Sequence, residues 1–404
     1  MHQPDDRVTR IDRGALGLVV AALPFRLLLA LGTDLSPDEA YYLSVQRHAL
    51  PFYDHPPLTP WLAGLLDNLP IPLELRVRAP ALLLGTMAGL MILIWVKQQG
   101  GDRHAQRWAA LLGSWLALPL AAGFLMTPDV PMLTATLSLA LLHTRIRSMD
   151  ESAYIDLKRC VWITVVCWVG MLAKVSMLLP VICFVAASKK RACLSASVAA
   201  MVGVVIALPL CWNSLFFQLD HAFAPNPNHG ALLASLGAVT AAFGAQLALW
   251  GPSLVIGFKR AMKPSFERNL IVAMTALVAL SALIRAIAPE PNWYAPAAIA
   301  FIAGASHTMH IATRWRRITT VLVGPVLALA FATHVLVPWM PLPIHVDPSA
   351  RLHGWSEETF SVHAPQNAPG VGKYGTASEA CIYHSKCKKI YKIQMDKIKT
   401  SSFD

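Results

Sequence analysis

Charged residues are scarce in this chain, and their scarcity excludes a water-soluble globular protein. Only 14% of the 404 residues are Asp, Glu, Lys or Arg, whereas soluble domains contain about 25%. Hydrophobic residues make up 55% of the chain. They gather in runs close to the roughly 20 residues that a helix needs to cross a bilayer core. The composition therefore predicts an all-α integral membrane protein with many spans.

Common cofactor and nucleic-acid motifs are also lacking. The chain has no CxxC pair, no metal-finger spacing, no GxGxxG or P-loop motif and no tandem repeat. Its net charge of +11 does not indicate nucleic-acid binding, because no basic helix is interleaved with aromatic residues. The first apolar run follows Arg7, Arg10 and Arg13 and lacks a small-residue cleavage site. We therefore expect a retained span there rather than a signal peptide.

The apolar segments predict a bundle of about 11 transmembrane helices over residues 1–338. The expected spans are 14–32, 77–96, 109–126, 130–144, 160–173, 175–188, 193–211, 236–257, 269–288, 295–312 and 318–338. Loops on one side of this arrangement hold 20 Lys and Arg, and the rest of the chain before residue 339 holds six. This asymmetry predicts a cytoplasmic N-terminus, and the Ala- and Leu-rich composition favours a bacterial inner membrane.

Residues 160–188 resemble one long span with Lys174 inside it. A single crossing would invert every later loop and destroy the charge asymmetry. We therefore expect two short passes that join at Lys174, each about 21 Å long at 1.5 Å per residue. Five cysteines lie in or beside spans and are interpreted as small apolar fillers: Cys160, Cys167, Cys183, Cys193 and Cys211.

Residues 339–404 are expected to form a short extracytoplasmic tail whose end is polar and basic. Cys381 and Cys387 lie in this tail, where an oxidising compartment would permit a disulfide.

Acids, bases and cations converge on the face opposite the basic loops. The first outer loop, residues 33–76, contains Asp38, Glu39, Asp54 and His55. Other ionisable or amide residues expected at the same face are Asp129, Lys174, Gln218, Asp220, His221 and Arg285. Tyr and Trp residues flank the acids, as is common in the headgroup layer. This clustering favours an active site at the membrane interface over a pore through the bilayer.

Structural roles compete with functional ones for most of these residues. Ser36 to Glu39 form a capping-box pattern at the start of a helix that would lie along the membrane from Asp38 to His48. Asp54 and His55 suit a solvated turn, and Asp129 suits a helix cap. Lys174 and Arg285 suit side chains that reach toward lipid headgroups, and His221 suits a surface histidine.

Six short motifs carry a resemblance to a known family. They are SPDEAYY (36–42), YDHPPL (53–58), TPDVP (127–131), LAK (172–174), FQLDH (217–221) and EPNWYAP (290–296). In this order they resemble the GT-C glycosyltransferases over about residues 10–340. The most similar group transfers sugars from polyprenyl phosphates and includes lipid A aminoarabinose transferases and relatives of protein O-mannosyltransferases. The tail beyond residue 380 has no counterpart that we identify, and it is shorter than the extracytoplasmic domain usual in this family.

The resemblance implies a GT-C bundle with interfacial helices in the first outer loop. It implies transfer of a sugar, with inversion, from a polyprenyl-phosphate donor to lipid A, another glycan or a protein. The family's first-loop acid matches Asp38, with Glu39 beside it, and its second acidic position matches Asp54. These three residues form the expected catalytic set, in which Asp38 is the base that deprotonates an acceptor hydroxyl.

The other expected roles concern binding. Cations would neutralise the carrier phosphate, and the candidates are Lys174, Arg285 and Arg78. Further substrate-binding candidates are His55, Asp129 and Gln218. Some relatives bind a divalent metal ion near the second acid, which makes Asp54 and His221 candidate ligands. If the acceptor is a phosphate, Asp38 would orient it rather than deprotonate it.

Two other functions fit a polytopic chain with ionisable residues. The first is a transporter or flippase for a lipid-linked sugar, for which polar residues near mid-span and matching repeated halves are typical. Neither feature is evident, because the polar residues cluster at one face. The second is an inactive scaffold that retains the GT-C-like bundle without a working site.

Overall fold

The computed structural model of the chain describes residues 10–49, 54–149, 155–187, 191–223, 232–251, 253–263, 265–287, 289–309, 311–343, 347, 349–353 and 382. These residues are mainly helical, and none of them forms a strand. The expected all-α architecture is confirmed. The predicted tail and its Cys381 and Cys387 lie mostly or wholly outside the described residues.

The α-helices follow one another in this order: α1 Arg13–Leu31, α2 Pro37–Arg47, α3 Leu58–Gly64, α4 Leu73–Gln98, α5 Arg103–Trp115, α6 Ala117–Ala122, α7 Asp129–Arg147, α8 Leu157–Ala173, α9 Leu178–Ala187, α10 Arg191–Phe223, α11 Leu232–Trp250, α12 Ser253–Ala261, α13 Phe266–Arg285, α14 Ala295–Thr308, α15 Arg314–Val321 and α16 Leu327–Leu336. Short 3₁₀ or π turns lie between or after them: η2 Val175–Met177, η3 Pro291–Tyr294, η4 Leu322–Val326 and η5 Ser349–Arg351.

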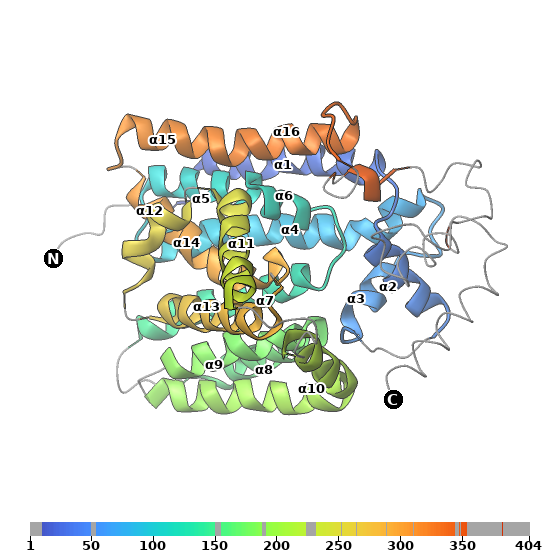
Figure 1. The fold of residues 1–404 in the computed structure, drawn as a ribbon. Helices are drawn as coiled ribbons and strands as arrows, with labels where there is room; N and C mark the ends of the chain where they lie inside the picture. The colour runs from blue at the N-terminus through green and yellow to red at the C-terminus, as the bar shows by residue number, and fades with distance from the viewer. Residues whose placement is uncertain are drawn as a thin grey trace.

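Most of the longer helices run side by side in Figure 1, α11 crosses them in this view, and α2 and α3 lie together at one end. Five helical segments are long and apolar enough to cross a membrane: Arg13–Leu31, Leu73–Gln98, Leu194–Phe223, Phe266–Arg285 and Arg314–Leu336. Other expected spans are shorter or interrupted helices that pack against these five. The chain is therefore an integral membrane protein.

The chain reverses direction at Lys174, as the charge pattern predicts. Thr164 of α8 donates a hydrogen bond to the Ala199 carbonyl of α10, and the Met171 carbonyl accepts one from Cys211. From the first hydrogen bond to the second, the residue numbers increase on both helices, so α8 and α10 run in the same direction. Because α9 connects them, it runs the opposite way.

The sequence predicts the ends and breaks of several spans wrongly. Residues 212–223 are expected in a loop but form the last turns of α10. Trp212 and Phe216 in this stretch are exposed, which extends the apolar surface of the helix beyond the predicted end. Gly251, with a φ of 58°, ends α11 within the expected span 236–257. Such a backbone conformation is readily adopted by glycine.

Leu116 separates α5 from α6 within the expected span 109–126. Arg26 of α1 is buried beside this break and donates to the carbonyls of Ser114 and Pro119 at 3.1 and 3.0 Å. A break frees backbone carbonyls from helical bonding, and a buried carbonyl needs a partner. Arg26 supplies that partner inside the bundle.

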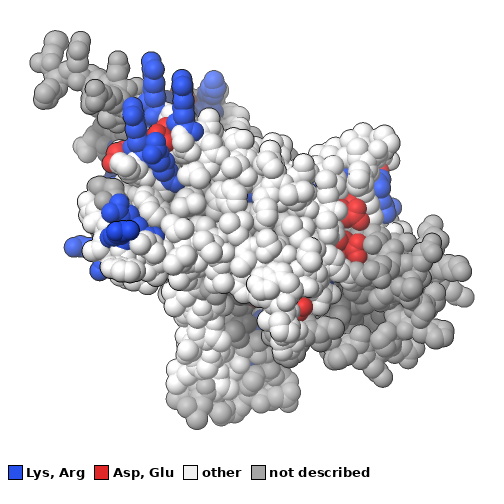
Figure 2. Space-filling view, turned by 90° about the horizontal axis from the view of Figure 1, so that it is seen from above, with Lys and Arg blue, Asp and Glu red and all other residues white. Residues whose placement is uncertain are grey.

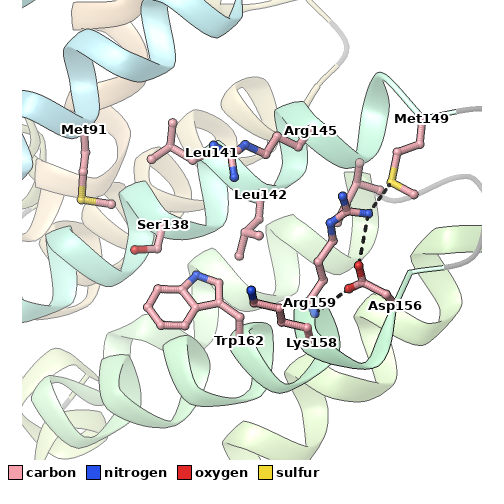
Figure 3. Close-up of a pocket in the computed structure, with 11 residues that line it drawn as sticks. Met91, Ser138, Leu141, Leu142, Arg145, Met149, Asp156, Lys158, Arg159 and Trp162 are labelled. Atoms are coloured by element: carbon pink, nitrogen blue, oxygen red, sulfur yellow. Dashed lines mark hydrogen bonds and ion pairs between the residues drawn. The ribbon is translucent and has the colours of Figure 1, made fainter.

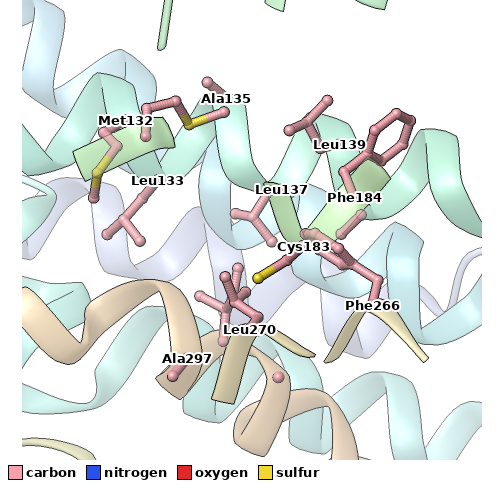
Figure 4. Packing of buried hydrophobic residues seen from close by; sticks show 14 of the residues in the cluster. Met132, Leu133, Ala135, Leu137, Leu139, Cys183, Phe184, Phe266, Leu270 and Ala297 are labelled. Atoms are coloured by element: carbon pink, nitrogen blue, oxygen red, sulfur yellow. The ribbon is translucent and has the colours of Figure 1, made fainter. Parts of the chain in front are cut away.

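The core is formed where α7, α9, α13 and α14 meet. Figure 4 shows side chains of these helices interlocked, among them Leu137, Phe184, Leu270 and Ala297. Every residue of α14 from Ala295 to His307 is buried, which small side chains make possible. A Cβ atom added at Gly304 would meet the Gly257 carbonyl of α12, so these two helices approach closely through their glycines.

Charge is distributed unevenly along the bundle. In Figure 2 Lys and Arg gather at one end, a mainly uncharged band follows, and acidic residues appear near the other end. The last turns of α4, α7 and α12 are basic. The uncharged band is the surface expected to face lipid.

Candidate active site

Helix α2 begins with the capping arrangement that the sequence predicts. The Ser36 hydroxyl accepts a hydrogen bond from the Glu39 amide at 3.3 Å, and Glu39 Oε2 accepts one from the Ser36 amide at 2.9 Å. Pro37 occupies the first helical position, where its missing N–H is not needed. This start fixes the directions in which Asp38 and Glu39 leave the helix.

Glu39 points into the protein and pairs with Arg78 of α4. The two side chains are wholly buried, and Arg78 Nη2 lies 2.8 Å from Glu39 Oε2. The guanidinium also donates to the carbonyls of Ala30, Thr33 and Asp34 at the end of α1. Glu39 Oε1 accepts from the Met126 amide at 2.9 Å. Every nitrogen of Arg78 thus has a partner, and the pair ties α2 to the ends of α1 and α4.

The side chain of Asp38, unlike that of Glu39, is exposed to water. Protein nevertheless surrounds its carboxyl closely enough to remove part of its hydration. This burial raises the pKa of Asp38 to about 6, and the negative charge of Glu290 adds to the effect, whereas Arg351 opposes it. Asp38 of α2 therefore lies close enough to Glu290, just before η3, and to Arg351 of η5 for their charges to act on it.

Asp54 and His55 lie beside α2. Asp54 Oδ1 accepts the Tyr41 hydroxyl at 3.0 Å and the His55 amide at 2.8 Å. Gln218 of α10 donates to the Asp54 carbonyl at 2.7 Å. Burial raises the pKa of Asp54 to about 7, so the carboxyl is partly protonated near neutral pH.

His55 is neutral in this environment. Burial, followed by the charges of Lys174 and His221, holds the pKa of His55 well below its usual value. Its Nδ1 atom is buried and has no hydrogen-bond partner among the described residues. One ring nitrogen of His55 is therefore available to a ligand.

Asp129 and Lys174 form a second buried ion pair. Lys174 Nζ lies 2.9 Å from Asp129 Oδ1, and Asn292 donates to Asp129 Oδ2 at 2.7 Å. Asp129 makes no capping hydrogen bond at the start of α7. Lys174 is 4% exposed and is directed at the acid rather than at the headgroup layer. The alternatives of a helix cap and a headgroup-directed lysine are therefore wrong in this structure.

His221 and Arg285 complete the set of predicted residues. The His221 ring lies 6.2 Å from the Phe217 ring and 5.9 Å from the Trp293 ring, measured between centroids. Arg285 ends α13 and forms no hydrogen bond or ion pair with other described residues, although its charge acts on His221. Arg285 is therefore the predicted phosphate ligand that the surrounding protein leaves least occupied.

The described residues do not contain three or more His, Cys, Asp or Glu side chains grouped closely enough to hold a metal ion. Asp54 and His221 alone would supply two ligands, and Asp54 Oδ1 is already engaged by Tyr41 and the His55 amide. The expected metal pair therefore does not fit a closed site.

Four residues at the site are absent from the sequence-based assignment: Tyr41, Glu290, Asn292 and Arg351. Tyr41, Glu290 and Asn292 lie within the SPDEAYY and EPNWYAP motifs, so the motifs mark them without revealing their contacts. Arg351 has no sequence signal. It reaches Asp38 only because η5 returns to the end of the bundle, where the Leu352 carbonyl accepts a hydrogen bond from the Asp34 amide.

Comparison with known proteins bears on the fold and on part of the sequence. A family model described as dolichyl-phosphate-mannose-protein mannosyltransferase matches residues 54–216. The fold is similar to the crystal structure of ArnT from Cupriavidus metallidurans in the apo state, with a TM-score of 0.55 and 15% sequence identity. The match covers 83% of this chain and 67% of the ArnT chain. The chain shares the fold of ArnT, and the family model matches less than half of its residues. No curated protein sequence matches it.

The family-model match and the likeness in fold support the resemblance carried by the six motifs. The region matched by the family model contains Asp54, His55, Asp129 and Lys174 but begins after Asp38. The likeness to ArnT concerns the fold. The roles of individual residues must therefore be argued from their chemistry in this chain.

Proposed function

We propose that this protein is a GT-C glycosyltransferase that transfers a sugar from a polyprenyl-phosphate carrier to an acceptor of the cell envelope. The observation that supports this most is Asp38, a water-accessible carboxyl with a pKa near 6 beside the Asp129–Lys174 pair. The site lies at one end of an apolar bundle, where a lipid-borne donor and a water-borne acceptor can meet. The basic loops at the other end favour the outer face of a bacterial inner membrane.

Asp38 acts as the general base in this proposal. An acceptor hydroxyl attacks the anomeric carbon of the sugar, the bond from that carbon to the carrier phosphate breaks, and the hydroxyl proton passes to Asp38. A carboxylate whose pKa is raised binds a proton more tightly, which makes it a better base at neutral pH. For a phosphate acceptor, which is already ionised, Asp38 would serve to orient the attacking oxygen.

Arg285 and Lys174 stabilise the departing carrier phosphate. Arg285 is the predicted phosphate ligand that has no ion-pair partner among the described residues. Lys174 is held by Asp129 and adds positive charge in a fixed position. Fixed cations aimed at a developing negative charge need no reorganisation during the reaction, which is the main source of their effect.

Glu39 and Arg78 take a positioning role in our proposal, in place of the catalytic and phosphate-binding roles suggested by the sequence. Their donors and acceptors are engaged within the protein. Gln218 also positions, because it holds the backbone at Asp54. His55, through its unpartnered ring nitrogen, and Asp54 are left to bind the acceptor.

The test is transfer of radiolabelled sugar from polyprenyl-phosphate donors to an envelope extract by the purified protein in vesicles. We expect Asp38→Asn to lower the transfer rate by about 10²- to 10⁴-fold, the usual contribution of a general base, while donor binding is retained. Wild-type rates should fall as pH decreases through about 6. Asp220→Asn removes a neighbouring exposed acid and serves as the matched control.

Three results would overturn the proposal. Full transfer by Asp38→Asn would remove the assignment of the base. A wild-type protein that moves lipid-linked sugars between leaflets without transferring sugar would be a flippase. A protein that does neither with any donor would be a scaffold.

A further inference from the structure

A cavity lies at the end of the bundle opposite Asp38. It has a volume of about 440 Å³ and lies between α4, α7 and α8. Lys174, after the last residue of α8, pairs with Asp129 at the first residue of α7. The cavity is lined instead by the last turns of α7 and the first turns of α8. It is therefore remote from the candidate active site.

The cavity combines an apolar wall with a basic rim. Figure 3 shows Met91, Leu141, Leu142 and Trp162 around it. The charged residues of the lining are Arg145, Lys158, Arg159 and Asp156. Among the described lining residues, three cations against one acid give the rim a net positive charge.

The cations of the rim differ in the hydrogen bonds and ion pairs that their side chains form. Arg159 lies 3.9 Å from Asp156 and also donates to the Met149 sulfur at 3.7 Å (Figure 3). The side chains of Arg145 and Lys158 make no hydrogen bond or ion pair with any residue in the described part of the chain. Two cations therefore remain available to an anion at the mouth of an apolar cavity.

This combination selects among ligands. A soluble anion would use the cations but not the apolar wall. A neutral lipid would use the wall but not the cations. A phospholipid with net negative charge uses both, with its acyl chain on Met91, Leu142 and Trp162 and its phosphate near Arg145 and Lys158. Basic residues at the headgroup level attract anionic lipids in this way.

A neighbouring groove provides an internal contrast. It lies between α8 and α10, has a volume of about 610 Å³, and contains no charged residue in its lining. Val161 and Val198 are among its exposed residues. This groove suits acyl chains of any lipid and gives no reason for a headgroup preference.

We propose that the α4–α7–α8 cavity binds an anionic phospholipid from the leaflet at the basic end of the bundle. Arg145 and Lys158 bind the phosphate, and Trp162 packs on the acyl chain.

Fluorescence quenching tests this proposal with the whole protein in vesicles. The vesicles contain phosphatidylcholine and either brominated phosphatidylglycerol or brominated phosphatidylcholine at equal mole fraction. The contribution of Trp162 is obtained by subtracting the signal of Trp162→Phe. We expect brominated phosphatidylglycerol to quench this contribution at least twofold more than brominated phosphatidylcholine. Millimolar inorganic phosphate should not reverse the difference, because it cannot occupy the apolar wall.

Matched variants assign the preference to the rim. We expect Arg145→Gln with Lys158→Gln to abolish it, and Arg145→Lys with Lys158→Arg to retain it. Arg317→Gln removes an exposed basic residue elsewhere on α15 and should change nothing. A tryptophan introduced by Val198→Trp in the Trp162→Phe background should be quenched equally by both lipids.

Three results would overturn the proposal. Equal quenching of Trp162 by the two brominated lipids would show no headgroup preference. A preference that survives the double glutamine substitution would lie elsewhere. Reversal by inorganic phosphate would identify a site for soluble anions rather than for lipid.

Discussion

Asp38 and Glu39 are adjacent in the sequence and have opposite environments. Successive residues of a helix point about 100° apart, so the first turn of α2 sends one carboxyl outward and the other inward. Glu39 is wholly buried and paired with Arg78. Asp38 is exposed to water and has no such partner among the described residues. A carboxylate whose oxygens are ion-paired and hydrogen-bonded within the protein stabilises the fold. A carboxylate that has no such partner and a raised pKa is available for proton transfer.

The same contrast separates the other charged pairs near α2. Asp129 and Lys174 are buried but share the site with Asn292. Arg47 and Asp67 lie closer to solvent, with side chains 31% and 23% exposed. The energetic consequence of breaking each pair should therefore decrease in the order Glu39–Arg78, Asp129–Lys174, Arg47–Asp67.

Removal of Arg78 should have the largest effect on folding. We expect Arg78→Ala to destabilise the protein by about 3–5 kcal/mol, because it leaves the Glu39 charge buried and unpaired. Arg78→Lys should rescue little, since a lysine cannot reproduce the forked donor pattern. The measurement is thermal unfolding in detergent, with Asp38→Asn as the comparison. If Arg78→Ala unfolds no earlier than Asp38→Asn, the distinction between the two acids is wrong.

Removal of Lys174 should have an intermediate effect. We expect Lys174→Gln to destabilise the protein by roughly 1–3 kcal/mol, because Asp129 loses its charge partner but retains a hydrogen-bond donor in Asn292. Transfer should also fall, because the substitution removes a cation from the site. Asn292→Ala is the complementary variant. It should lower stability less than Lys174→Gln, and the opposite order would show that Asn292 is the main partner.

Asp54 should show an effect of the opposite sign. Its pKa is raised from 3.8 to about 7, so its contribution to stability is greatest below pH 3.8 and is lost as pH rises through 7. At pH 8 the folded protein holds a poorly hydrated charge. We expect Asp54→Asn to stabilise the protein by on the order of 1–2 kcal/mol at pH 8.

At pH 4 the gain from Asp54→Asn should vanish, because the wild-type carboxyl is then protonated. The measurement is thermal unfolding of both proteins at the two pH values. The asparagine retains an oxygen that can accept the Tyr41 hydroxyl, so Tyr41→Phe serves as a control for that hydrogen bond. A gain of equal size at both pH values would contradict the assignment to charge burial.

The Arg47–Asp67 pair should contribute least. Exposed ion pairs are screened by water and usually contribute about 0.2–1 kcal/mol. We therefore expect Arg47→Gln to change the free energy of unfolding by less than about 1 kcal/mol, although its hydrogen bonds are short, at 2.6 and 2.7 Å. An effect as large as that of Arg78→Ala would mean that burial does not govern these pairs.

Several features of the fold could be predicted from local sequence. The apolar runs indicate a membrane-spanning helical bundle, and the order Ser36, Pro37, Asp38, Glu39 indicates where α2 begins. The basic loops predict a reversal at Lys174, which the parallel course of α8 and α10 confirms. These features depend on periodicity, on capping and on charge asymmetry, all of which act over a few residues or along single segments.

Tertiary structure alone decided which charged residues are engaged. The sequence suggests Glu39 for catalysis and Arg78 for phosphate binding, but their burial depends on contacts across 39 positions of sequence. The break at Leu116 is stabilised by Arg26, 88 positions before Ser114. Arg351 approaches Asp38 only because a distant turn folds back over the site. The sequence by itself determined the bundle and the group of polar residues at one end. Packing decided which of them remain available, because the pairing and hydration of a charge depend on every segment that surrounds it.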